Sequence, residues 1–332
     1  MIFSNKQQLV FDKYLNDENI FITGPGGTGK TAIIRELANH ARKNNKIIQI
    51  CALTGCATVL LNCKAKTIHS WSGIGLANND IDYIVNDIYE NKYKRRNWRN
   101  IDILIIDEVS MLSLKLFNLL DQVAKACRGN RLPFGGIQII FSGDFFQLPP
   151  IGTEKEPDTL KFCFESKLWN EYFPNQIILE ENFRQTGEEY NNILNEIRIG
   201  KITNKSYNTL KKYVGRNINL ENELKPTILY PTRNKVDQIN KNSLEKLKGD
   251  YIKFKIEVCN INELTISEKD RRSLEKYSNK QISYELNNLI SNVNCEKKLK
   301  LKIGAQVMCI ANIDMESKYP IYNGSQGIIK EF

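Results

Sequence analysis

Residues 24–31 read GPGGTGKT, a spacing of glycine, lysine and threonine that suits a phosphate chain. The segment follows an apolar run and opens a stretch with helical periodicity, the context in which G-x-x-x-x-G-K-[ST] binds nucleotides. Glycines let backbone N–H groups approach phosphate oxygens, and a helix N-terminus adds positive potential. We expect Lys30 to reach the β- and γ-phosphates and Thr31 to hold Mg²⁺. The loop before them consists of Gly24, Pro25, Gly26, Gly27, Thr28 and Gly29.

Two adjacent acids, Asp107 and Glu108, end the apolar run at 101–106. An Asp at a strand end can hold Mg²⁺ through water, and a neighbouring Glu can polarise an attacking water. Such a pair is also common as a helix N-cap, but its position after a phosphate loop favours catalysis. We therefore assign Asp107 to the metal and Glu108 to the general base, which predicts hydrolysis of the nucleotide.

Two further residues are candidates for contacts with the γ-phosphate. Gln147 lies in SGDFFQLPPI (142–151), just after an apolar run, where its amide could sense the γ-phosphate or its water. Arg184, in LEENFRQ (179–185), could neutralise charge during phosphoryl transfer. The alternatives are an ordinary loop glutamine and a surface ion pair.

The elements that position these residues are visible as short, continuous apolar runs, which are typical of strands buried on both faces. Amphipathic periodicity between the runs predicts helices. Strand–helix–strand repetition implies a parallel sheet with right-handed crossovers, so we expect a doubly wound α/β domain to about residue 180. The expected strands are 19–23, 47–51, 101–106 and 137–143, and the expected helices are 30–42 and 114–127.

The second half is less regular. Its polar stretch at 250–298 is interpreted as an insertion or as peripheral helices, and NGSQG at 323–327 predicts a tight turn before a last strand. The remaining expectations are helices at 187–199 and 203–213, a strand at 226–231, a helix through Leu247, and alternation over 299–310 with a turn at Gly304.

Composition narrows the class of protein. The 332 residues carry 47 basic and 38 acidic side chains, a net charge of +9, which fits a nucleic acid partner or a merely basic protein. No apolar run approaches the roughly 20 residues that cross a bilayer, so no membrane span is expected. Eight cysteines without a CxxC pair predict reduced thiols in an intracellular protein rather than disulfides or a metal centre.

The segment LFNLLDQVAKACRGNRLPFGGIQIIFSGDFFQLPPI (116–151) resembles the signature region of the Pif (petite integration frequency) DNA helicases. This family belongs to the RecD-like, 5′→3′ branch of superfamily one. FSNKQQLV resembles its adenine-reading motif, and ALTGCATVLL and KTIHSWSGIG resemble its first DNA-contacting motifs. The resemblance spans nearly the whole chain and is weakest over 215–295. Its later matches are FRQTGEEYNNILNEIRIG, PTRNKVDQIN, LKLKIGAQVMCIANID and YNGSQGIIKEF.

The resemblance implies a RecA-like P-loop NTPase domain over 1–180, with a small basic insertion at about 71–100. A second, incomplete RecA-like domain is expected over 181–332, with the polar insertion at about 250–298. The implied function is an ATP- and Mg²⁺-dependent 5′→3′ DNA helicase or translocase in replication, repair, recombination or telomere maintenance. Single-stranded and fork or partial-duplex DNA are the implied partners. The alternatives are an ATP-gated module that binds single-stranded DNA, a helicase fragment without unwinding activity, and a P-loop enzyme acting on small molecules.

The resemblance also implies roles for individual residues. Gln7 is expected to hydrogen-bond the adenine edge, Gln147 to couple the nucleotide state to DNA, and Arg184 to contact the γ-phosphate from the second domain. His69 has an alternative as a buried, hydrogen-bonded histidine, and Trp71 either packs in the core or stacks on bases. The implied single-strand track consists of Thr54, Gly55, Thr67, His69 and Ser70.

The run KYKRRNWR (92–99) places basic residues beside aromatic ones, which suits phosphate contacts and base stacking. We expect Arg95, Arg96 and Trp98 to contact DNA; the alternative is a solvated charge run. The family carries its small duplex-facing insertion at this position.

Two motifs that the family carries near its C-terminus have no counterpart in the chain, so we expect a fragment of a longer helicase or a broken reading frame. The adenine-reading motif begins within the first few residues, so no cleavable targeting peptide is expected. A nuclear, bacterial-cytoplasmic or viral replication site is expected, and a monomer is favoured.

Overall fold

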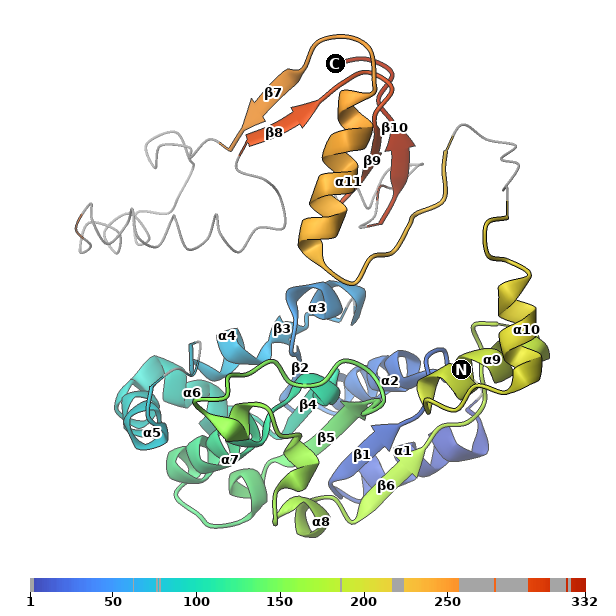
Figure 1. Cartoon of the computed structure of the whole chain (residues 1–332). Helices are drawn as coiled ribbons and strands as arrows, with labels where there is room; N and C mark the ends of the chain where they lie inside the picture. Colours follow the sequence, from blue (N-terminus) through green and yellow to red (C-terminus); the bar gives the residue numbers. More distant parts are fainter. Residues whose placement is uncertain are drawn as a thin grey trace. The chain divides into compact units, whose positions relative to one another are not determined.

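Contacts within the chain divide it into two compact units, Met1–Val214 and Gly215–Phe332. The computed structural model describes residues 3–61, 63–75, 77, 79–185, 187–216, 224–256, 278, 298–310, 321 and 324–332 (Figure 1). We expected the division near residue 180. The first unit instead extends through two helices that follow the last strand of its sheet, α9 (Glu188–Arg198) and α10 (Asn204–Lys211).

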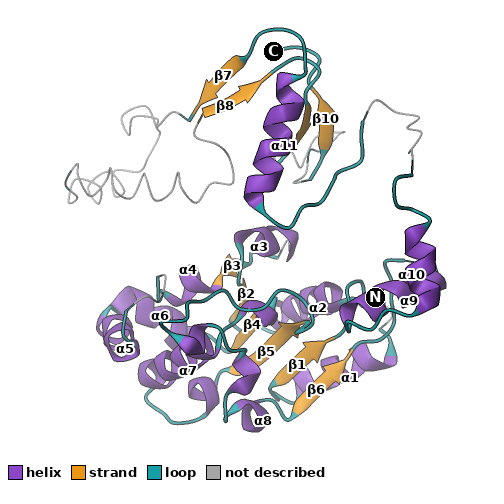
Figure 2. Cartoon of the chain, viewed as in Figure 1, coloured by secondary structure: helices purple, strands orange, loops and turns teal. Residues whose placement is uncertain are grey.

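Six strands of the first unit form a parallel sheet in the order β3-β2-β4-β5-β1-β6 (Figure 2). This confirms the α/β class and the four expected strands, and it adds β3 and β6, which the sequence did not reveal. The strands are β1 (Ile20–Thr23), β2 (Ile48–Ala52), β3 (Lys66–Thr67), β4 (Ile103–Asp107), β5 (Gln138–Gly143) and β6 (Asn175–Ile178).

Helices cover both faces of the sheet, which explains the continuous apolar runs. Along β4, Ile103 and Ile105 pack in one hydrophobic cluster, whereas Leu104 and Ile106 pack in the other, because successive side chains of a strand point to opposite faces. The first cluster includes side chains of α1 (Asn5–Leu15), α2 (Lys30–Lys43) and α3 (Gly55–Leu61). The second includes side chains of α4 (Ile68–Ser72), α5 (Ile81–Glu90), α6 (Lys92–Asn100), α7 (Leu114–Arg128) and α8 (Trp169–Tyr172).

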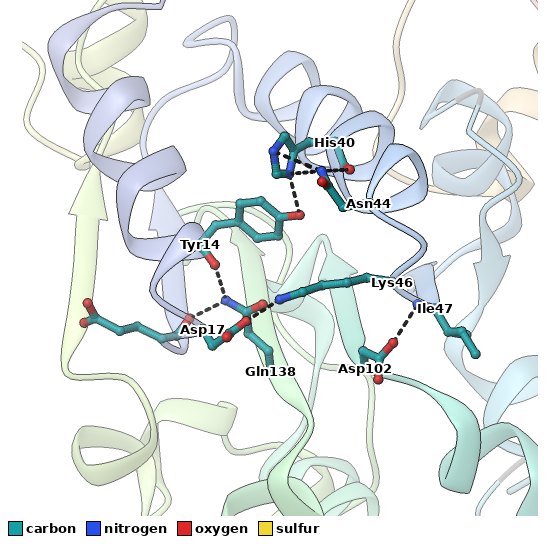
Figure 3. A network of polar contacts seen from close by, with 9 residues as sticks. Tyr14, Asp17, His40, Asn44, Lys46, Ile47, Asp102 and Gln138 are labelled. Carbon is teal, nitrogen blue, oxygen red and sulfur yellow. Dashed lines mark hydrogen bonds and ion pairs between the residues drawn. The ribbon is translucent and has the colours of Figure 1, made fainter.

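A polar network fixes α1 against the rest of the unit (Figure 3). The Tyr14 hydroxyl and His40 Nδ1 of α2 lie 3.0 Å apart in a hydrogen bond, and burial raises the pKa of Tyr14. Gln138 Nε2 of β5 donates to the carbonyl oxygens of Tyr14 and Glu18, at 3.0 Å each. The helix that carries Gln7 is thereby held to both a neighbouring helix and the sheet.

The second unit contains one described helix and two antiparallel strand pairs. Strand β7 (Ile252–Lys255) pairs with β8 (Lys298–Leu301), and β9 (Gln306–Met308) pairs with β10 (Gln326–Ile328). The expected helix is α11 (Arg233–Glu245), and the turn at Gly304 is confirmed by its place between β8 and β9.

One expectation for the second unit was wrong. Residues 226–231 form no strand; Ile228 and Leu229 are 68% and 89% exposed and belong to an irregular segment. The polar stretch at 250–298 contains β7 near its start, and most of the rest lies outside the described residues, so its interpretation as an insertion or as peripheral helices stays a prediction. No helix in the described ranges is long and apolar enough to cross a membrane.

Candidate nucleotide-binding and active site

The candidate site residues at the ends of β1, β4 and β5 lie at one edge of the sheet of the first unit. The phosphate loop follows β1, Asp107 ends β4, and Asp144 follows β5. Because the strands are parallel, these ends meet at the same edge, where α/β proteins bind their ligands. The phosphate loop, Asp107 and Asp144 are therefore close in space although they are far apart in the sequence.

The phosphate loop is closely covered by two other segments. At Gly29, which has φ +84°, an added Cβ would lie 2.5 Å from Nε2 of Gln7. At Gly27, with φ +88°, it would lie 2.8 Å from Oδ1 of Asn182. These contacts place α1 and the loop after β6 directly against the glycines, so the loop has a defined shape that only glycine permits at these positions.

Lys30 begins α2 and points back across the loop. Its Nζ donates to the carbonyl oxygens of Gly24 (2.7 Å) and Pro25 (2.9 Å). Burial lowers the pKa of Lys30, and the nearby carboxylates of Asp144, Asp107 and Glu108 oppose that effect. The ammonium thus lies where phosphate oxygens would meet the loop, beside the acids that end the neighbouring strands.

Asp107 and Glu108 occupy the position expected for the catalytic acids. Asp107 is buried, and burial raises its pKa, whereas the charge of Lys30 lowers it. Burial also raises the pKa of Glu108, and the neighbouring Asp107 adds to the effect. Glu108 has φ +58°, a left-handed conformation that costs a residue with a side chain roughly 1–3 kcal/mol and is typical of functional sites.

The residues present fit a magnesium ion bound together with a nucleotide. Thr31 lies in the first turn of α2 and Asp107 at the end of β4, so a hydroxyl and a carboxylate lie at the same edge of the sheet. Mg²⁺ commonly uses one or two carboxylates, waters and substrate phosphates rather than a cage of protein ligands. Within the described ranges no group of three or more His, Cys, Asp or Glu side chains could hold a metal ion without such phosphates.

Gln147 is part of a network that the sequence did not reveal. Asp144, which is 2% exposed, accepts a bidentate pair from Arg198 of α9: Nε to Oδ2 at 2.8 Å and Nη2 to Oδ1 at 2.7 Å. Gln147 Nε2 donates to the same carboxylate at 3.1 Å, and the Phe146 N–H donates at 3.2 Å. Burial opposes ionisation of Asp144, but Arg198, Gln147 and the Phe146 N–H together lower its pKa.

The loop after β6 brings Arg184 to the phosphate loop. The Phe183 N–H donates to the Gly27 carbonyl at 2.9 Å, and Asn182 Oδ1 accepts from the Arg184 N–H at 2.9 Å. The guanidinium approaches Gly26, since a Cβ built there would lie 4.0 Å from Nη1 of Arg184. We expected Arg184 to come from a second domain; it lies in the same compact unit as the phosphate loop.

Gln7 lies at the start of α1 in a capping box. The Ser4 N–H donates to its Oε1 (3.1 Å), and its own N–H donates to Ser4 Oγ (3.3 Å). The side chain is 4% exposed, and its amide meets Gly29. Phe183, which the sequence analysis missed, also lies beside Gly29: a Cβ there would be 3.5 Å from its ring. A flat ring and an oriented amide suit a nucleobase.

The five residues of the expected single-strand track lie at the carboxyl ends of β2 and β3, at the edge of the sheet that also carries the acids: Thr54 and Gly55 follow β2, Thr67 ends β3, and His69 and Ser70 lie in α4. Thr54 Oγ1 accepts from the Ala57 N–H, and Thr67 Oγ1 accepts from the Ser70 N–H, so both threonines cap helices. Gly55 and Ser70 are exposed.

His69 is half-buried and lines a cavity of about 310 Å³ together with Leu53, Met111 and Ile151. Burial lowers the pKa of His69 and so favours the neutral ring. The histidine is therefore at a concave surface rather than enclosed in the core.

The basic run at 92–99 forms α6, and the structure corrects one residue of its expected interface. Trp98 is fully buried, packs 4.8 Å from the Trp71 ring between centroids, and donates from Nε1 to the Ser72 carbonyl. Neither tryptophan is available for base stacking. Of the two alternatives for Trp71, the structure therefore supports packing in the core. Arg96 is exposed, and Arg95 lies over the Tyr89 ring at 4.9 Å.

Comparison with known proteins matches this geometry to one family. Residues 2–208 match the model of the PIF1-like helicase family, and residues 285–332 match that of the 2B domain of DNA helicase Pif1. The second match falls in the region where we expected a partial second RecA-like domain.

Three proteins illustrate the similarity. The chain is 37% identical to the ATP-dependent DNA helicase PIF1 of Saccharomyces cerevisiae over 99% of its own length, and it spans 36% of that protein. It superposes on the crystal structure of Pif1 helicase from Candida albicans with a TM-score of 0.78 and 31% identity, covering all of this chain and 69% of that one. A Pif1 helicase from Bacteroides, in complex with ADP-AlF3 and single-stranded DNA, gives a TM-score of 0.67 and 26% identity, covering all of this chain and 70% of that one. On these matches, the chain belongs to the PIF1-like helicase family.

Proposed function

We propose that this chain binds and hydrolyses ATP as the motor part of a 5′→3′ DNA helicase. The observation that carries the proposal is the meeting of the phosphate loop, Asp107, Glu108 and Arg184 at one edge of a single parallel sheet. Membership of the PIF1-like family supports it, as does the Bacteroides relative with ADP-AlF3 and single-stranded DNA.

Each group has a role that follows from its place. Backbone N–H groups of the phosphate loop and the Lys30 ammonium bind the phosphates. Glu108 accepts a proton from the attacking water, and its raised pKa makes it a better proton acceptor than an ordinary carboxylate. Arg184 neutralises charge that develops on the γ-phosphate, and Gln147 orients the water or senses the phosphate.

The base and the metal complete the nucleotide site. Gln7 hydrogen-bonds the adenine edge, and the Phe183 ring covers the face of the base. Thr31 and Asp107 would hold Mg²⁺, which when bound would supply positive charge at the phosphates. Because its hydrogen bonds match the adenine edge, Gln7 selects ATP over nucleotides with a different base.

Single-stranded DNA binds along the track of Thr54, Gly55, Thr67, His69 and Ser70, with Arg95 and Arg96 as phosphate contacts. The second unit contributes part of a second RecA-like domain and, at 285–332, a segment of the 2B kind. Hydrolysis drives movement on single strands and unwinding of forks or partial duplexes by a monomer. A protein that acts on such DNA would be located in a nucleus, a bacterial cytoplasm or a viral replication site. It would act in replication, repair, recombination or telomere maintenance.

The test measures ATP turnover with and without a single-stranded oligonucleotide. We expect strong stimulation by DNA that Lys30→Ala abolishes, whereas Lys43→Ala, an exposed lysine on the same helix, leaves turnover unchanged. Partial duplexes with a 5′ or a 3′ single-stranded tail then test direction, and the 5′ tail is expected to support unwinding.

Other outcomes assign other functions. Tight ATP binding without stimulated turnover would assign the chain to ATP-gated binding of single-stranded DNA. Absence of both stimulation and salt-sensitive DNA binding would indicate a P-loop enzyme acting on small molecules.

A further inference from the structure

Helix α9 contacts the surroundings of the nucleotide site at both of its ends. Near its start, Asn191 Oδ1 accepts from Asn182 Nδ2 at 3.1 Å, and Asn191 Nδ2 donates to the Gln185 carbonyl at 3.1 Å. These contacts hold the short loop that carries Arg184. At its end, Arg198 holds Asp144 and, through Asp144, Gln147.

The contact of Arg198 with the Gln147 loop is made at several points. Besides the bidentate pair with Asp144, its guanidinium lies 4.5 Å from the centroid of the Phe146 ring. The side chains of Arg198 and Asp144 are 21% and 1% exposed, so the pair is largely removed from water. A buried bidentate pair fixes orientation as well as distance.

The two ends of the helix are rigidly related. Asn191 and Arg198 lie two turns apart on α9, a separation of roughly 10 Å along a helix axis. A shift of the helix therefore moves the loop that carries Arg184 and the loop that carries Gln147 together. Arg198 lies within the FRQTGEEYNNILNEIRIG match, but the sequence assigns it no role, and it lies 54 residues from Asp144.

We propose that Arg198 is a positioning residue, which acts through Asp144 to hold Gln147 in place and makes α9 a rigid connection between Gln147 and Arg184. The proposal deepens the function proposed above and rests on it for its kinetic consequence. Its structural consequence, an ordered Gln147 loop, does not depend on activity.

Hydrogen exchange measures the structural consequence. The Phe146 N–H donates to the Asp144 side chain and the Gln147 N–H to the Asp144 carbonyl, so both amides are protected by this loop geometry. In Arg198→Ala we expect both to exchange about tenfold faster or more, because local opening becomes easier. Arg198→Lys keeps the charge but not the bidentate geometry, and should give an intermediate rate.

Arg128→Ala is the matched control. Arg128 also donates several hydrogen bonds to backbone carbonyls of the first unit, at Gly135, Trp98, Arg99 and Ile101, but it has no contact with the Gln147 loop. Its substitution should leave exchange at Phe146 and Gln147 unchanged. Unchanged exchange in Arg198→Ala, or equal acceleration in both variants, would overturn the proposal.

Turnover with single-stranded DNA measures the kinetic consequence. Arg198→Ala should lower kcat about tenfold, which corresponds to about 1.4 kcal/mol, with a much smaller change in the KM for ATP. The double variant with Gln147→Ala should be no slower than Gln147→Ala alone. If the two losses multiply, Arg198 acts independently of Gln147 and the proposal is wrong. If the wild-type chain shows no turnover, the proposed function fails, and hydrogen exchange still decides whether Arg198 positions the loop.

Discussion

The contact between Gly29 and Gln7 yields a quantitative prediction for Gly29→Ala. A Cβ at this position would lie 2.5 Å from Gln7 Nε2, and φ is +84°, so the substitution imposes both a clash and an unfavourable backbone conformation. The backbone effect alone costs roughly 1–2 kcal/mol. If the glutamine side chain turns away to relieve the clash, it loses the hydrogen bond from the Ser4 N–H, which contributes roughly 0.5–1.5 kcal/mol.

Gly129→Ala is the control that separates these two effects. Gly129 has φ +67° at the end of α7, and an added Cβ would meet nothing within 4 Å. Gly129→Ala should therefore lower the free energy of unfolding by about the backbone cost alone. Gly29→Ala should lower it by about 1 kcal/mol more, and chemical denaturation measures the difference.

Nucleobase selectivity is the second readout. Displacement of the Gln7 amide should lower the preference for ATP over GTP in Gly29→Ala about as much as Gln7→Ala does, and the double variant should show no further loss. The ratio of the two affinities cancels any general damage to the phosphate loop. Equal stability of Gly29→Ala and Gly129→Ala, with an intact ATP preference, would refute the inferred contact.

Three further predictions concern the acids and the basic helix. Trp98→Ala should lower the free energy of unfolding by about 4 kcal/mol, whereas Arg96→Ala should leave stability nearly unchanged and weaken binding of single-stranded DNA, measured by fluorescence anisotropy. Glu108→Gln should reduce ATP turnover at least about 100-fold while ATP still binds, and should raise the melting temperature because it removes a half-buried charge beside Asp107. Asp144→Asn should be less stable than the wild type by about 3 kcal/mol at neutral pH, in chemical denaturation as a function of pH. Because the folded pKa of Asp144 lies below its unfolded value, the difference should shrink as the pH falls below about 4.

These predictions fail in distinct ways. Loss of DNA affinity in a folded Trp98→Phe variant, with no loss in Arg96→Ala, would return the tryptophan to the DNA interface. Normal turnover in Glu108→Gln would remove its role as the general base. A stability difference for Asp144→Asn that grows toward low pH would contradict the direction of the Asp144 pKa.

Local patterns in the sequence were sufficient for the phosphate loop and for four strands of the sheet, but not for β3 and β6. The apolar run at 101–106 predicts a strand because burial on both faces leaves no room for polar side chains, and β4 lies at Ile103–Asp107. GPGGTGKT predicts a phosphate loop because glycines permit the positive φ angles that Gly27 and Gly29 adopt. The positions of Asp107 and Glu108 could be predicted because the two acids come directly at the end of that strand.

Residues whose role depends on distant partners could not be found in the same way. Arg198 is one basic residue at the end of an amphipathic helix until Asp144 is placed beside it. Trp98 lies in a strongly basic run, and it contacts Trp71 only because its position on α6 lies on the face that packs against the core. The one signal in the sequence that Trp98 is buried was its spacing of three residues from Ile101, which places the two apolar side chains on one face of a helix, where both are buried.

The strand order of the first unit has a consequence for how the protein is made. Strand β1 is translated before both of its neighbours, β5 and β6, with Ile20 opposite Ile140 and Asn175. At roughly 5–20 residues per second, β1 waits at least several seconds for its first partner. Strands β2 and β4, which lie closer in sequence, can pair earlier. The phosphate loop that follows β1 is thus translated well before its sheet is complete, and until then β1 is an exposed apolar strand that a chaperone would bind.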